Sequence, residues 1–121
     1  MQKSYRLYLD DIFACINRIE KYTGDLSYEE FIKNELVADA VIRNLEIIGE
    51  ASKNLPIEIK RKHENIEWNK IIGFRNILIH EYSGVNFKII WDVIKNKIPM
   101  LKETINRINQ DFLINNGKKA Y

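Results

Sequence analysis

Cysteine, proline and glycine are scarce in this sequence. Its 121 residues include one cysteine, Cys15, with two prolines and five glycines. A single cysteine rules out an internal disulfide framework, and so few turn-forming residues leave little room for a turn-rich β fold. No apolar run approaches the roughly 18 residues that a membrane-spanning helix needs. These absences favour a helical protein, in which Cys15 is expected to be a small packed residue.

No charge of one sign dominates the chain, which carries a net charge of +2. Proteins that bind nucleic acid by charge alone usually show a marked basic excess or a dense basic patch. The densest cluster is "KRKH" at residues 60–63, and Lys118 and Lys119 add charge near the end. We interpret both as solvated faces, and expect any RNA to bind locally or across an oligomer. The polar start "MQKSYRLYLDD" does not resemble a secretory signal, so a cytoplasmic protein is predicted.

Apolar residues recur every three or four positions along most of the chain, which is the pattern of amphipathic helices. Gly24 suits a C-terminal cap for the first helix, and Ser27 with Glu30 forms a capping box that opens the next piece. Asn86 suits an N-cap, and Pro99 is expected to kink or restart the pattern. The predicted helices cover 3–22, a piece after Ser27, 34–54, a short turn over 56–63, about 67–79, 86–97, and a last segment carrying Leu101 to Phe112.

The pattern predicts one all-α domain, an up-and-down bundle of about five helices over residues 1–114. Residues 115–121, at the polar end "NNGKKAY", are expected to form a frayed tail.

The stretch "GFRNILIHEYSG" at residues 73–84 places polar groups in an apolar run. On a helix, Arg75 lies close to the line of Trp68 and Ile79, where a guanidinium is costly unless it is paired or faces a cleft. His80 lies about 140° further around a regular helix. Arg75 and His80 therefore meet only if the helix ends near Ile79 and His80 turns back, or if two chains supply the site.

An arginine and a histidine together suit phosphodiester cleavage. A neutral imidazole can take a proton from a ribose 2′-hydroxyl, and a guanidinium can hold the phosphate and its transition-state charge. The plainer interpretation pairs Arg75 with Glu46 or Glu50 and makes His80 a helix cap. From the spacing alone, both interpretations stay open.

Metal and cofactor chemistry have little support in the sequence. His63 and His80 are the only histidines, and no pair of residues has the spacing of metal ligands. Glu46 and Glu50 lie one helical turn apart, which is more typical of an exposed face or an arginine partner than of a carboxylate metal site. No glycine-rich phosphate loop or nucleophile elbow occurs. We therefore predict neither a metal nor a cofactor.

Three segments in order resemble the HepT-like family of HEPN-domain proteins: "RNLEIIGEASKNLP" at 43–56, "W-x3-IIGFRNILIHEY" at 68–82 and "IIWDVIKNKIPML" at 89–101. The resemblance covers roughly residues 4–110. It implies an all-α HEPN bundle that forms homodimers and sometimes assembles further. It also implies the toxin of a two-gene toxin–antitoxin module, whose antitoxin is a minimal nucleotidyltransferase.

The family motif R-x4-H-x-Y falls on Arg75, His80 and Tyr82. The resemblance implies that Arg75 and His80 are metal-independent ribonuclease residues at the dimer cleft. We expect single-stranded RNA or transfer RNA ends as substrate, because an exposed backbone can bend for in-line attack. It implies that the partner enzyme attaches AMP to Tyr82 and silences the toxin. Asn76 is expected to orient the substrate or His80.

The polar face of the central helix carries Arg43, Glu46 and Glu50, which line the same cleft or pair with one another. Glu50 is a candidate hydrogen-bond anchor for Arg75. Gly49 on the same helix is expected to allow a close helix–helix or dimer contact.

Two other functions remain open from the sequence. One is a non-catalytic helical binding module that docks the nucleotidyltransferase and is modified by it. The other is a structural dimer in which the motif is vestigial.

Overall fold

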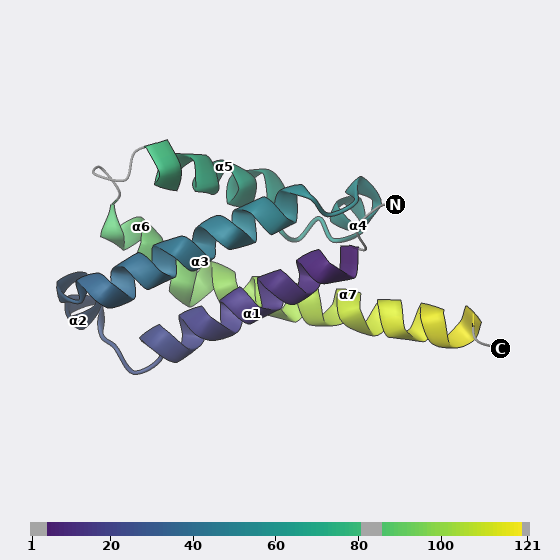
Figure 1. Ribbon diagram of the computed structural model, residues 1–121, viewed down its shortest axis with the longest axis horizontal. Coiled ribbons are helices and arrows are strands. Elements are labelled where there is room, and N and C mark those ends of the chain that lie inside the picture. Colours follow the sequence, from purple (N-terminus) through teal and green to yellow (C-terminus); the bar gives the residue numbers. More distant parts are fainter. Residues whose placement is uncertain (1–4, 81–85, 120–121) are drawn as a thin grey trace.

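Every regular element in the described part of the chain is helical, as the sequence predicts (Figure 1). The computed structural model describes the backbone of residues 5–80 and 86–119, and the side chains of residues 5–74 and 86–114. The helices are α1 (Tyr5–Thr23), α2 (Tyr28–Lys33), α3 (Glu35–Lys53), α4 (Ile57–Lys62), α5 (Trp68–His80), α6 (Phe87–Asp92), the π-helical η2 (Val93–Lys97) and α7 (Ile98–Lys119).

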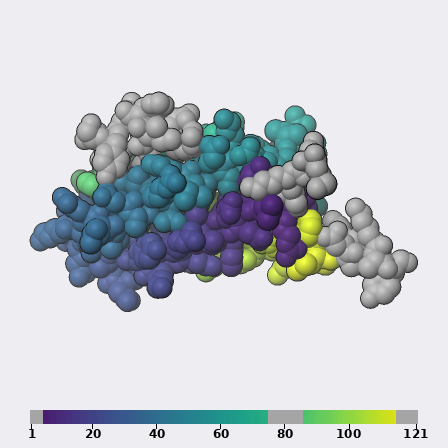
Figure 2. Space-filling view, viewed as in Figure 1, coloured from purple at the N-terminus to yellow at the C-terminus, as the bar shows by residue number. Residues whose placement is uncertain are grey.

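The long helices form an up-and-down bundle. In Figure 1 α1, α3, α5 and α7 alternate in direction, and α3 lies between α1 and α5. α3 packs against both of these helices, and α1 and α3 lie side by side on the face shown in Figure 2. α7 contacts α1. α5 is thus held mainly by its contact with α3, at one side of the bundle.

The apolar stripes predicted from the sequence meet in one core. Cys15 is buried among them, as predicted, and its burial raises the pKa of the thiol. Gly49 is buried on α3, which makes the contact with α5. The largest fully buried apolar side chains are Phe31, Leu9, Ile12, Ile16, Ile19, Ile48, Ile90, Leu101, Ile105 and Val41.

The helix starts predicted at Ser27 and Asn86 are confirmed. Ser27 and Glu30 form the reciprocal capping box: the Ser27 backbone N–H donates to Glu30 Oε1 at 2.9 Å, and the Glu30 N–H donates to Ser27 Oγ at 3.1 Å. The hydrogen bond from the Ser27 backbone lowers the pKa of Glu30. Asn34 and Asn86 cap α3 and α6 by accepting from Val37 and Lys88. Short polar side chains therefore set where these helices begin.

Gly24 follows α1, as predicted for a residue at the C-terminal end of the first helix. Its N–H donates to the Glu20 carbonyl at 2.8 Å, and its φ is not positive. A Cβ at this position would lie only 2.9 Å from the Glu20 oxygen. The absence of a side chain thus permits a close backbone contact.

Pro99 is expected to kink or restart the helical pattern, and the α-helical pattern is interrupted by the π-helical η2 just before it and resumes in α7, with the chain helical throughout. The Ile98 N–H donates to the Val93 carbonyl, five residues earlier. Proline has no N–H, and its ring crowds the carbonyl four residues before it, here that of Lys95. The wider π turn of η2 accommodates these two constraints.

α7 is tied to other parts of the bundle by polar contacts. Lys102 Nζ lies 2.8 Å from Glu20 Oε1 on α1, and Asn65 Nδ2 donates to Thr104 Oγ1 at 2.9 Å. The backbone is helical as far as Lys119, and the division into a domain and a frayed tail at residue 114 stays a prediction. None of the described helices combines the length and the apolar character that crossing a bilayer requires.

Candidate active site

Arg75 and His80 of the predicted motif lie on α5, and Trp68 fixes the first turn of this helix. The indole Nε1 donates a hydrogen bond to the His63 carbonyl at 3.1 Å, and the ring is buried. Ile71 and Phe74 pack against the core on the following turns. The first half of α5 is therefore anchored, and the second half carries Arg75 and His80.

Arg75, Asn76 and His80 all lie within α5, and only the backbone of these three residues is described. Their side chains, and all of Tyr82, lie outside the described residues. Because helix covers both positions, the Cα atoms of Arg75 and His80 lie about 140° apart around the axis and about 7.5 Å apart along it. The sequence left open an arrangement in which the helix ends near Ile79 and His80 turns back toward Arg75. In the structure His80 is the last residue of α5, so its backbone is still helical.

Two lines of positions run along α5. Arg75 falls about 20° from Trp68, which is buried, so position 75 continues the line that faces the core at its start. His80 falls in a sector about 60° wide that also holds Asn69, Gly73 and Asn76. A Cβ built on Gly73 would meet nothing within 4 Å. The line of His80 is thus open at Gly73.

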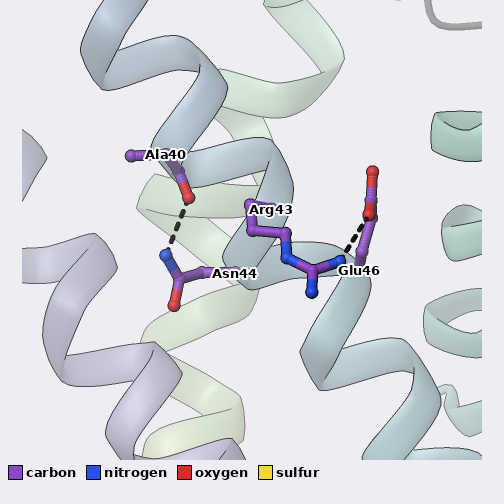
Figure 3. Close-up of polar contacts among 4 residues, drawn as sticks. All are labelled: Ala40, Arg43, Asn44 and Glu46. Carbon is purple, nitrogen blue, oxygen red and sulfur yellow. Dashed lines mark hydrogen bonds and ion pairs between the residues drawn. The ribbon is translucent and has the colours of Figure 1, made fainter.

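The polar residues predicted on α3 form one ion pair among themselves (Figure 3). Arg43 Nη1 lies 3.5 Å from Glu46 Oε2, with exposed side-chain fractions of 72% and 22% respectively. This is the internal pairing that the sequence left open. The roles predicted for Arg43, Glu46 and Glu50 toward Arg75 stay predictions.

Asn44 is a buried polar residue that the sequence analysis did not single out. Its Nδ2 donates to the Ala40 carbonyl at 2.7 Å, and Oδ1 has no hydrogen-bond partner among the described residues (Figure 3). The side chain is 6% exposed. In the sequence, only its position beside the apolar stripe of α3 indicates that Asn44 is buried.

An apolar hollow of about 320 Å³ lies between α5 and the segment formed by α6, η2 and α7. Leu45 and Ile48 of α3 line it, as do Ile71 and Phe74 of α5. Ile89 also lines it and is 52% exposed. One flank of α5 therefore borders an apolar surface that the described chain leaves partly uncovered.

A second hollow, of about 410 Å³, lies at the start of α5 and is lined by apolar as well as charged side chains. We call it the basic groove; its polar lining residues are Lys60 and Arg61 of α4, Glu64, Glu67, and Asn69 and Lys70 of α5. Lys70 forms an ion pair with Glu67 at 2.7 Å. The hydrogen bond that Lys70 donates to the Glu67 carboxylate lowers the pKa of Glu67.

His63 is the histidine whose side chain is described. Burial lowers the pKa of its imidazole, with Asp111 acting in the opposite direction. In residues 5–74 and 86–114, no group of three or more histidine, cysteine, aspartate or glutamate side chains is placed to hold a metal ion.

Comparison with known proteins gives consistent matches over most of the chain. A family model described as "Ribonuclease HepT-like" matches residues 12–108. A Thermococcus cleftensis protein named "Probable ribonuclease HepT" is 41% identical over 110 residues, which are 91% of this chain and 100% of that protein. The "mRNA nuclease HepT" of Shewanella oneidensis is 24% identical, over 83% of this chain and 92% of that protein.

A longer relative contains this chain as a part. The "Gamma-glutamylcyclotransferase and putative RNase" of Methanocaldococcus jannaschii is 42% identical over 98% of this chain, and the chain spans 54% of that protein. No match was found among solved structures.

Proposed function

Because the chain belongs to the HepT-like ribonuclease family, we propose that it is a metal-independent endoribonuclease and the toxin of a two-gene toxin–antitoxin module. Arg75 and His80 are the proposed catalytic residues. The observation that carries this assignment is their placement on one helix, α5, inside the region that the family model matches. RNA, including transfer RNA, is the proposed substrate.

The proposed reaction uses the ribose next to the cleaved phosphate. The His80 imidazole accepts the proton of the 2′-hydroxyl, and the 2′-oxygen attacks phosphorus. The bond from phosphorus to the 5′-oxygen breaks, and the leaving oxygen takes a proton from the imidazolium or from water. The Arg75 guanidinium holds the phosphate and stabilises the added negative charge of the transition state.

In the proposed homodimer, an arginine and a histidine from different chains can contact the same phosphate, which the two residues of one α5 cannot. Since positions 75 and 80 lie about 140° apart on a regular helix, we assign Arg75 of one chain and His80 of the other to each phosphate. The apolar hollow beside α5 supports this proposal, because the exposed side chains of Ile89 and Met100 line it and suit contact with a second copy.

Other polar residues have supporting roles in this proposal. Asn76, in the same sector of α5 as His80, orients the substrate or the imidazole. Glu50 holds Arg75 through a hydrogen bond, and the Arg43–Glu46 ion pair borders the same cleft.

Tyr82 is the proposed site of control. A minimal nucleotidyltransferase, the antitoxin, attaches AMP to its phenol. Tyr82 follows His80 by two residues, so the adenylate adds bulk and negative charge close to the catalytic pair. It then competes with the substrate phosphate for Arg75.

The test is cleavage of total cellular RNA and transfer RNA in EDTA by protein made without its partner. Intact mass first verifies that Tyr82 carries no adenylate, and His80→Ala protein prepared identically detects contaminating nuclease. We expect cleavage by the wild type and none by the variant. Absence of cleavage by unmodified, dimeric protein would contradict the proposal. It would favour the alternative function, a non-catalytic binding module that docks the nucleotidyltransferase.

A further inference from the structure

We propose that an RNA strand binds along one open line of α5, from the basic groove at its first turn to His80. The strand contacts Lys60 and Arg61 in the groove and then passes over Gly73. This inference rests on the proposed function, because it names the path by which that substrate reaches the site.

The groove end of the path has the chemistry of a phosphate contact. Lys60 and Arg61 come from the last turn of α4, and their side chains line the hollow together with Lys70. Two carboxylates also line it. Glu67 is engaged by Lys70 at 2.7 Å and by Lys97 at 4.0 Å. Glu64 offsets one of the two charges of Lys60 and Arg61. The remaining positive charge of the groove suits a phosphodiester backbone.

Gly73 gives the second, independent observation. A glycine inside a helix costs about 1 kcal/mol relative to alanine, and nothing in the described fold requires one here. A Cβ would meet no atom within 4 Å, and φ is not positive. Glycine at such a position permits close approach of another molecule to the helix backbone.

The register of α5 joins these two features to the motif. Asn69 lines the groove, and Gly73, Asn76 and His80 follow it at helical spacing on one face. Asn69 and His80 are separated by about 16 Å along the axis, a length that a few nucleotides span. The line therefore leads from the groove to the proposed general base.

The composition of this line favours RNA over a protein partner. Its described members are polar or lack a side chain, and the exposed large apolar residues of the described chain lie elsewhere, apart from Ile57 at the groove. An apolar contact with a second copy is better supplied by the hollow on the other flank of α5.

The first experiment measures binding of a single-stranded 2′-O-methyl RNA 12-mer, which lacks the attacking hydroxyl. We expect Lys60→Glu/Arg61→Glu to weaken binding about tenfold or more and to flatten its dependence on salt. Lys21→Glu/Lys33→Glu makes the same charge change at exposed positions on α1 and α2, and should bind within about twofold of the wild type. Equal weakening by both pairs would overturn the proposal.

Gly73→Gln provides a variant that does not harm the fold. Glutamine favours helix, and the space at Gly73 is open, so the variant should be at least as stable as the wild type. It should nevertheless bind the 12-mer about tenfold more weakly, with its self-association unchanged. Normal RNA binding combined with loss of the dimer would assign Gly73 to contact with a second copy and overturn the proposal.

His80→Ala separates the two claims. It should bind the 12-mer like the wild type while losing cleavage. RNA binding along this line by a wild-type chain that cleaves nothing would remove the proposed function and leave this inference intact. If the groove and Gly73 variants cleave and bind RNA like the wild type, the path along α5 is wrong and the proposed function stands.

Discussion

The indole of Trp68 donates a hydrogen bond to the backbone carbonyl of His63, and this contact fixes the start of α5 to the end of α4. Trp68→Phe keeps an aromatic ring and removes the donor. We expect the free energy of unfolding to fall by about 1 to 3 kcal/mol, because a partly buried carbonyl loses its partner. Urea denaturation followed by circular dichroism measures this loss. A variant as stable as the wild type would show that the contact does not anchor the helix.

Two glycines should respond oppositely to alanine. Gly24→Ala places a Cβ 2.9 Å from the Glu20 carbonyl oxygen, so the backbone must shift and stability should fall by about 1 kcal/mol. Gly73→Ala meets no neighbouring atom and should raise stability by about 0.5 to 1 kcal/mol. Thermal and urea denaturation of the two variants in parallel test this contrast, which equal shifts in either direction would refute.

His63 predicts a pH dependence of stability. Burial lowers its pKa below the ordinary value of 6.5 in the folded chain, so the unfolded chain binds more protons near that pH. The stability contributed by neutral His63 is therefore present above pH 6.5 and is lost as the pH falls toward the folded-state pKa. His63→Gln should lose less stability between pH 8 and pH 5 than the wild type.

Urea denaturation across this pH range provides the measurement. His80→Ala serves as the matched control, because it removes the other histidine and should keep the loss that His63 causes. An unchanged pH dependence in His63→Gln would contradict the assignment.

The proposed dimer surface is testable at Ile89. This side chain is 52% exposed at the apolar hollow, and Leu113 on α7 is 57% exposed outside it. Ile89→Lys should convert a dimer of the 14.4 kDa chain into monomer, because a lysine charge would have to be desolvated in the interface. Leu113→Lys should remain dimeric. Sedimentation equilibrium distinguishes these outcomes, and dissociation by Leu113→Lys alone would move the interface elsewhere.

Much of the fold is predictable from local chemistry. Ser27, Glu30 and Asn86 mark helix starts because their side chains pair with nearby backbone N–H groups, which depends on a few neighbouring residues only. The π turn before Pro99 was not predicted. It depends on how the helix keeps Ile90, Ile94 and Ile98 in the core while accommodating a proline, which periodicity alone does not reveal.

The site was predictable in part. The sequence predicts a helix over about 67–79 that carries Arg75 and leaves open whether His80 belongs to it; the structure extends α5 to His80. The angular separation of positions 75 and 80 then follows from helical register. The sequence leaves open whether Arg43 and Glu46 pair with each other, and the structure, which sets their rotamers, places them in an ion pair. The basic groove depends on how α4 meets α5, so it emerges only from the structure. Gly73 gave no signal of its own, since its open surroundings are a property of the packed bundle.

The central claim is that Arg75 and His80 from two chains act on one RNA phosphate. Its most direct test is a purified heterodimer of Arg75→Ala and His80→Ala chains, obtained with a different affinity tag on each. Each homodimeric variant should lose cleavage by a factor on the order of 10² or more. The heterodimer retains one complete site of two, so we expect it to recover about half of the wild-type rate in EDTA. A heterodimer as inactive as either parent would contradict a site shared between chains.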